Sequence, residues 1–144
     1  MSKIIALIVL FLSPSVVPAC SCLWAPTEAK YADADVIVIA EATAISTQTI
    51  ADTPSRHAEL ETVKWTVLRA WKGAYFEGDT FISRTNTECC ICGLSVARKG
   101  TIMLLYLSGR EPFGLSLCAG HQELPSDIKE VLLLDKLHGS SGGT

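Results

Sequence analysis

All six cysteines of this 144-residue chain lie after residue 19, behind an apolar leader. They are Cys20, Cys22, Cys89, Cys90, Cys92 and Cys118. An even number of cysteines in an exported domain predicts a disulfide framework. The sequence alone does not give the pairing. It does predict a small domain whose distant segments are tied together covalently.

Residues 1–19 are typical of a signal peptide. Lys3 gives the positive start, and the apolar run Ile4–Leu12 is shorter than the roughly 20 residues that span a bilayer. Small residues in Val17–Ala19 favour cleavage before Cys20. A cysteine at this place also fits a bacterial lipoprotein, in which its amine would be acylated. We expect a secreted protein, extracellular or periplasmic, with membrane attachment only if Cys20 is lipidated.

One domain is expected over residues 20–138, followed by a flexible tail at 139–144. The net charge of −3 argues against nucleic-acid binding, which usually needs a basic patch. The sequence contains neither Gly-x-Ser-x-Gly nor His-Glu-x-x-His, and His57, His121 and His138 show no metal-ligand spacing. We therefore predict neither an enzyme nor a bound cofactor.

Strand patterns recur along the chain, at residues 36–45, 60–71, 79–85, 101–107 and 115–118. In the second of these, Val63, Trp65 and Val67 alternate with polar residues, which predicts a half-buried strand. The polar segment 46–57, which contains Pro54, is expected to be a hairpin loop.

Helices are expected on either side of the strands. Thr27 is predicted to cap a short helix ending near Tyr31, and Ser126 to cap a helix over 127–137. The second helix has an apolar stripe made by Ile128, Val131, Leu132 and Leu134. These elements predict a mainly β fold with flanking helices. A five-stranded OB-like barrel with a C-terminal helix fits them, and a β-sandwich fits almost as well.

Five short motifs occur in an order typical of one protein family. They are Cys20–Cys22, Tyr31–Ile37, Trp71–Gly73, Cys92–Val96 and Leu115–Cys118. Together they resemble the N-terminal domain of the tissue inhibitors of metalloproteinases and the wider netrin-like modules, which are OB-folds. Ala32 stands where the family has a cysteine, and the partner of that cysteine is missing too. We also expect no counterpart of the second domain of the animal inhibitors.

The resemblance implies two disulfides, Cys20–Cys92 and Cys22–Cys118. It leaves Cys89 and Cys90 unassigned. These two could bond to each other, one could replace Cys92 as the partner of Cys20, or they could pair between chains.

The resemblance also implies a function. In these inhibitors the α-amine and carbonyl of the first cysteine chelate the zinc of a metalloprotease, so Cys20 would bind that zinc in trans. Ser21 would enter the specificity pocket of the protease. The expected protease contacts are Cys20, Ser21, Cys22, Leu23, Glu88 and Ile91.

Two other interpretations stay open. The Cys-x-Cys motif at residue 20 can anchor the N-terminus of an extracytoplasmic interaction module that inhibits nothing, since fold does not imply function. The cysteines of 20–22 and 89–92 could instead form a thiolate metal site, although export favours disulfides.

Overall fold

A computed structural model of the chain describes residues 22–23, 25–53, 56–87, 92–96, 98–124 and 128–141. The signal peptide predicted at residues 1–19 lies outside them. In chain order the elements are α2 (Thr27–Asp33), β1 (Val36–Thr53), β2 (Arg56–Lys72), β3 (Thr80–Asn86), β4 (Ile102–Leu107), the 3-10 turn η1 (Leu117–Ala119), β5 (Gln122–Glu123) and α3 (Ile128–Ser141).

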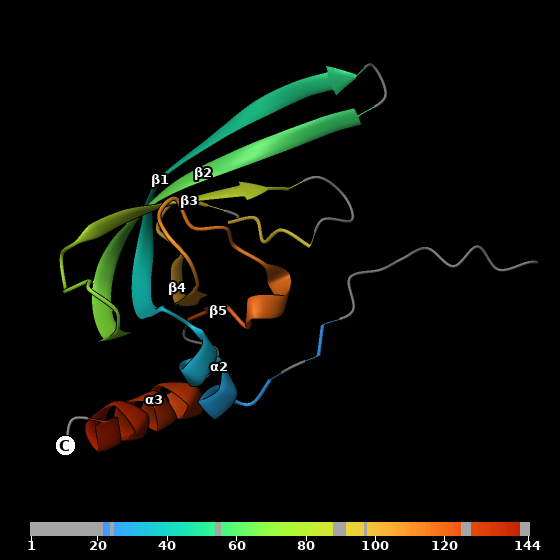
Figure 1. Cartoon of the computed structure of the whole chain (residues 1–144). Coiled ribbons are helices and arrows are strands. Elements are labelled where there is room, and N and C mark those ends of the chain that lie inside the picture. Colours follow the sequence, from blue (N-terminus) through green and yellow to red (C-terminus); the bar gives the residue numbers. More distant parts are fainter. Residues whose placement is uncertain are drawn as a thin grey trace, which may run out of the picture.

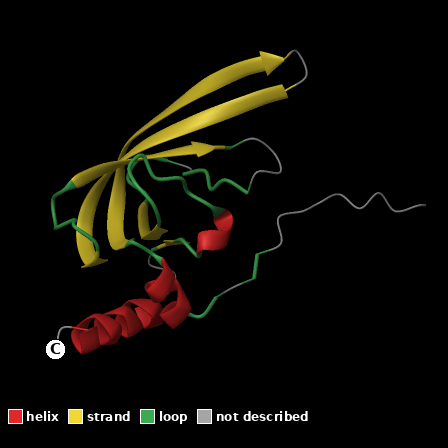
Figure 2. Cartoon of the chain, viewed as in Figure 1, coloured by secondary structure: helices red, strands yellow, loops and turns green. Residues whose placement is uncertain are grey.

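The strands form one sheet in the order β3-β2-β1-β4-β5, and each neighbouring pair is antiparallel (Figure 2). Helices α2 and α3 contact each other, and α3 contacts β2 (Figure 1). The predicted mainly β fold, with five strands and a C-terminal helix, is confirmed. Across the described stretches, every helix is too short or too polar to cross a bilayer.

The hairpin between β1 and β2 is much longer than the sequence predicts. The loop expected at residues 46–57 is wrong, because β1 continues to Thr53 and β2 begins at Arg56. Backbone pairing continues to the end of this ribbon, for example between Thr47 and Glu61. Residues 46–50 are all exposed. Since this part of β1 buries no face, it needs no alternation of polar and apolar residues, and its polar sequence resembles a loop.

The strand predicted at residues 115–118 is also wrong. Ser116 forms only an isolated bridge with Gly93, and the chain then enters η1. The Ser116 hydroxyl accepts a hydrogen bond from the Cys118 N–H at 3.2 Å, which favours the turn over an extended strand. The fifth strand of the sheet is instead the short β5, which pairs with Met103 and Leu104 of β4.

The main core lies on one face of the sheet. Val63, Trp65 and Val67 are all buried there, as their alternation predicts. Trp65 stacks with Phe81, and its indole N–H donates to the Ser83 hydroxyl at 2.8 Å. This bond satisfies the one polar group that the ring carries into the core.

A second apolar cluster packs between the other face of the sheet and the two helices. Its buried members are Ala34, Ile37, Trp71, Leu104, Tyr106 and Leu134. Two register shifts place extra residues on β2 after Val67, and they turn Trp71 away from the face that Trp65 occupies. Of the apolar stripe predicted on α3, Leu134 is buried and Val131 packs beside it, but Leu132 is exposed.

The outer edge of β3 is covered by the chain between β4 and η1. The Arg84 N–H donates to the Phe113 carbonyl, and the Phe113 N–H donates to the Ile82 carbonyl, at 2.8 and 3.0 Å. The Glu111 carboxylate accepts a further bond from the Ile82 N–H at 2.7 Å. Among the described residues, the outer edge of β3 is therefore protected by the isolated bridge between Ser83 and Phe113 and by the hydrogen bonds on either side of it.

Two helix ends differ from the prediction. The N-cap of α2 is Pro26, which makes no side-chain cap, and Thr27 bonds to Glu130 instead. Helix α3 runs through Gly139 to Ser141, into the tail expected at 139–144. The Ser140 hydroxyl donates to the Leu137 carbonyl at 2.8 Å, which satisfies a carbonyl that the end of a helix otherwise leaves free.

Candidate functional site

The N-terminal segment is bonded covalently to the far end of the chain. Cys22 forms a disulfide with Cys118 across a sequence separation of 96, with the Cα atoms 5.0 Å apart. This is the pair that the resemblance implies. Leu23, the next residue, has a side chain that is 96% exposed. The disulfide therefore fixes a strongly exposed apolar side chain beside the η1 turn.

A second segment runs alongside η1. The Leu94 N–H donates to the Leu115 carbonyl, and the Leu117 N–H donates to the Cys92 carbonyl, both at 2.9 Å. Gly93 lies so close to β3 that an added Cβ would be 2.1 Å from the Asn86 carbonyl oxygen. The chain therefore needs glycine at this position. The motif around Cys92 is held against the same turn that carries Cys118.

Most of the predicted protease contacts lie outside the described residues. Cys20, Ser21, Glu88 and Ile91 are in this group, as are Cys89 and Cys90. Cys92 is disulfide-bonded. Its implied pairing with Cys20 remains a prediction, because Cys20 is not described. Of the predicted contacts, the structure brings Cys22 and Leu23 together with the segments at Gly93 and Leu117.

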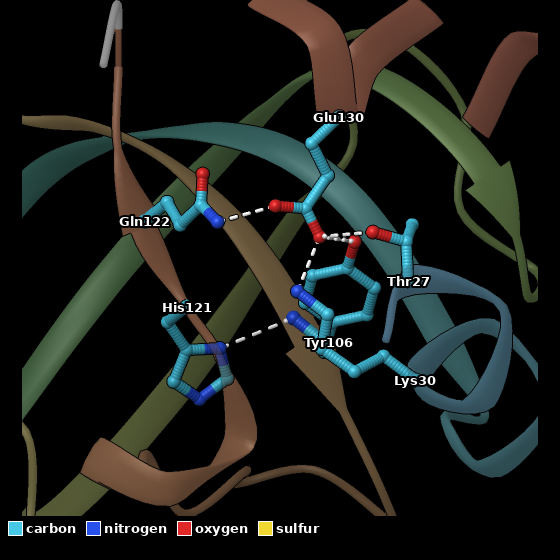
Figure 3. Close-up of polar contacts among 6 residues, drawn as sticks. All are labelled: Thr27, Lys30, Tyr106, His121, Gln122 and Glu130. Atoms are coloured by element: carbon cyan, nitrogen blue, oxygen red, sulfur yellow. Dashed lines mark hydrogen bonds and ion pairs between the residues drawn. The ribbon is translucent and has the colours of Figure 1, made fainter. Parts of the chain in front are cut away.

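A buried polar cluster lies where α2 and α3 meet the sheet (Figure 3). At its centre is the Glu130 carboxylate of α3, whose side chain is 6% exposed. One carboxylate oxygen accepts bonds from Lys30, from the Thr27 hydroxyl at 3.1 Å and from the Tyr106 hydroxyl at 2.6 Å. The other oxygen accepts a bond from Gln122. The cluster thus joins α2, β4, β5 and α3 through one acidic side chain.

The cluster sets the charges of its members. Burial alone raises the pKa of Glu130, but the hydrogen bonds from Lys30, Tyr106 and Thr27 outweigh it and hold that pKa below its usual value. Burial and the bond to Glu130 raise the pKa of Tyr106. Glu130 is therefore an ionised acceptor with its oxygens occupied, a state suited to holding structure rather than to proton transfer.

His121 borders the cluster and is held neutral. Its Nδ1 accepts a hydrogen bond from the Tyr106 backbone N–H at 3.1 Å. Burial and the nearby charge of Lys30 lower the pKa of His121 to about 4. Neutral His121 thus satisfies the Tyr106 backbone N–H at this end of β4, while its own buried Nε2 has no partner among the described residues.

The cluster also contacts the N-terminal anchor. Lys30 lies so close to Gly120 that an added Cβ there would be 2.7 Å from the Lys30 Cδ. A small pocket of about 160 Å³ lies between Lys30, Tyr106, Cys118 and Ala25. The buried cluster therefore supports α2 directly behind the segment that the disulfide fixes.

The sequence predicted no role for this cluster. Its members are spread from Thr27 to Glu130 and form no motif. One signal was present: Glu130 lies four residues before Leu134, so an acid shares the buried face of α3. In the described part of the chain, no three His, Cys, Asp or Glu side chains lie together as metal ligands would.

The lowered pKa of His121 predicts a loss of stability in weak acid. Between pH 6.5 and about 4 the unfolded chain binds a proton at this histidine that the folded chain does not. The free energy of unfolding should therefore fall with falling pH in this window, by at most about 1.4 kcal/mol per pH unit. Denaturant unfolding measured across the window tests this.

His138 provides the matched control, because it is exposed on α3. The variant His121→Asn keeps an acceptor near Tyr106 but cannot titrate. Its free energy of unfolding should therefore change less with pH in this window than that of the wild type. The variant His138→Asn should keep the wild-type slope. An unchanged slope in His121→Asn would refute the assignment.

The described geometry therefore has three parts: the anchored residues Cys22 and Leu23, the segment beside them at Gly93, and the cluster around Glu130. No model of a protein family matches this chain, and a search of curated proteins gives no significant match to it.

Proposed function

We propose that this protein is an exported inhibitor that docks on a zinc metalloprotease through its mature N-terminus. The observation that carries the proposal is the position of Leu23. This side chain is almost fully exposed, directly after a cysteine that is bonded to the rigid turn at Cys118. An exposed apolar side chain on a fixed backbone is the form that a protease-binding wedge requires.

The coordination chemistry of catalytic zinc explains why Cys20 would be the residue that contacts the metal. Catalytic zinc keeps a coordination position open for water or substrate. The α-amine and carbonyl oxygen of Cys20 would form a chelate in place of that water. An α-amine ordinarily has a pKa of about 7.7–8.0, so its neutral form is accessible near neutral pH. Ser21 would then extend into the specificity pocket of the protease.

The described residues would make the protease-binding segments rigid. The Cys22–Cys118 disulfide and the pairing of Leu94 with Leu115 hold two neighbouring segments in place. The cluster around Glu130 holds α2 behind them. Segments that are ordered before binding lose less conformational entropy on binding, which strengthens affinity.

The same proposal includes a barrel fold and an export signal. The fold would be an OB-like barrel, closed where the segment through Phe113 covers the edge of β3. Residues 1–19 would direct export, and their removal would leave Cys20 with a free amine. The disulfide at Cys22 is consistent with an oxidising compartment.

The first experiment compares two exposed leucines. Leu23→Ala should weaken inhibition of a susceptible zinc endopeptidase by about tenfold, because the side chain would be buried in the complex. Leu132 is also exposed, at 63%, but it lies on α3. Leu132→Ala should leave the inhibition constant unchanged. Equal effects of the two variants would refute docking through the N-terminal segment.

Mass spectrometry of the exported protein tests the chemical premise. A chain that begins at Cys20 with an unmodified amine is expected. An acylated or extended N-terminus would rule out chelation, and the protein would then be an extracytoplasmic interaction module or lipoprotein without inhibitory activity.

A further inference from the structure

The outer edge of β2 is open near the end of the strand. Its pairing with β3 ends where Thr66 faces Thr80, and the Val67 backbone then bonds to the turn before β3. In the described part of the chain, the backbone of residues 68–72 pairs only with β1, on the other side of the strand. This stretch therefore presents an edge with unpaired N–H and C=O groups, to which another extended chain can be added.

A hollow of about 410 Å³ lies along this open edge. Its lining comes from residues 68–72, from Gly73 and Tyr75–Glu77 in the turn after β2, and from His138 on α3. The volume lies within the range of about 300–1,000 Å³ that is usual for ligand pockets. Leu68 and Phe76 line the hollow and yet remain 38% and 73% exposed. Exposed apolar side chains around one hollow indicate an interaction site.

The basic side chains of the hollow lie on the face of the sheet that the helices cover. Arg69 bonds to Asp135 of α3, Lys72 donates to two carbonyls of α2, and His138 is part of α3. The bond to Asp135 uses the Nη2 of Arg69, so the guanidinium keeps donors for a second carboxylate. Among the described lining residues, Glu77 is the one acid. The lining thus favours a negatively charged ligand.

The opposite face of the sheet gives the hollow an apolar side. Ala70 and Tyr75 pack there against the main core. These contacts define the faces, since register shifts in the pairing with β1 interrupt the regular alternation of β2. A strand added beside residues 68–72 would send its own side chains to the two faces in turn. One set would meet Arg69 and His138, and the other would meet Ala70 and Tyr75.

We propose that the open edge of β2 binds an extended segment of a partner protein in which acidic and apolar residues alternate. The backbone of the segment pairs with residues 68–72, its carboxylates meet the basic side of the hollow, and its apolar side chains meet the other side. A small organic anion would use the charge but not the open edge, so the observations favour a peptide.

This site is separate from the protease-binding N-terminus. Figure 1 shows the turn after β2 and the C-terminal end of α3 on one side of the molecule, and the chain that leads into α2 on the other. A partner bound along β2 would therefore leave Leu23 accessible. Loss of peptide binding and loss of protease inhibition are distinguishable outcomes, because the two sites share no residue.

Fluorescence anisotropy with the labelled peptide Val-Glu-Val-Glu-Val tests the site. Its anisotropy should rise to saturation as the full protein is added. Val-Lys-Val-Lys-Val should bind at least about tenfold more weakly, because its ammonium groups would meet Arg69 and His138. The glutamate peptide methylated at its backbone nitrogens keeps the charge but cannot donate backbone bonds, and it should also bind at least about tenfold more weakly. No saturable binding, or equal binding of either control peptide, overturns the proposal.

Two exposed leucines provide matched variants of the protein. Leu68→Glu adds an acid to the lining and should weaken binding of the glutamate peptide at least about tenfold. Leu132→Glu adds the same charge on α3, outside the lining, and should bind the peptide as the wild type does.

Glu77→Lys tests the site by a gain of affinity, which a folding defect does not produce. It removes the acid from the lining and should strengthen binding of the glutamate peptide about threefold or more. An unchanged dissociation constant in Leu68→Glu or in Glu77→Lys overturns the proposed site. Equal losses in Leu68→Glu and Leu132→Glu overturn it as well, because they would show an effect of net charge alone.

Discussion

Replacing Glu130 with alanine should lower the free energy of unfolding by about 3–5 kcal/mol, as expected when one partner of a buried ion pair is removed. The variant leaves the Lys30 ammonium, whose side chain is 11% exposed, without its carboxylate. It also removes the acceptor of the Tyr106, Thr27 and Gln122 bonds. Denaturant unfolding at neutral pH measures the loss.

Two further variants separate the ion pair from general damage to a helix. Glu28 is an exposed acid on α2, and Glu28→Ala should cost less than about 1 kcal/mol. Lys30→Met combined with Glu130→Met should cost less than the two single changes added together, because it buries no unpaired charge. A loss below 1 kcal/mol in Glu130→Ala would show that the cluster does not stabilise the fold.

Adding one alanine ahead of Cys20 should weaken protease inhibition at least about 100-fold, which corresponds to about 2.8 kcal/mol of binding free energy. The extension converts the α-amine of Cys20 into an amide, and an amide nitrogen has no basic lone pair for zinc. It also places an extra residue where the chelate would meet the metal. Inhibition constants of the wild-type and extended proteins for one zinc endopeptidase measure the effect.

The control changes the neighbouring side chain and keeps the chelating atoms. Ser21→Ala retains the free amine of Cys20 and a small side chain, so inhibition should change only a few-fold. The extended protein should also keep the wild-type free energy of unfolding, since Cys22 and Cys118 are untouched. If the extended protein inhibits as well as the wild type, the inhibitor does not act by chelation.

Parts of the fold could be read from the sequence because burial leaves a period in it. Val63, Trp65 and Val67 alternate with polar residues, and all three are buried. Residues 102–107 form a continuous apolar run, and β4 covers all of it. Residues 46–50 of β1 have no such period, because this exposed part of the strand is held by backbone bonds to β2.

The faces of the elements were harder to predict. Trp65 and Trp71 are an even number of positions apart, which places them on one face of a regular strand. Register shifts in β2 send Trp71 to the face that packs on the helices, where its indole N–H donates to Asp135 at 2.7 Å. A bulge is a consequence of pairing with β1, so its position cannot be read from β2 alone.

The sequence by itself determined which segments could be strands and helices. It also indicated a segment that could direct export and the cysteines that could form disulfides. Those properties depend on local composition and on periods of two or 3.6 residues. Only the tertiary structure decided that Thr27, Lys30, Tyr106 and Gln122 meet around Glu130, and that the disulfide at Cys22 fixes Leu23 beside η1. These contacts join residues up to 103 positions apart, and they form only when α2 and α3 dock on the sheet. No local pattern encodes such a meeting, because its residues are brought together by the packing of four different elements.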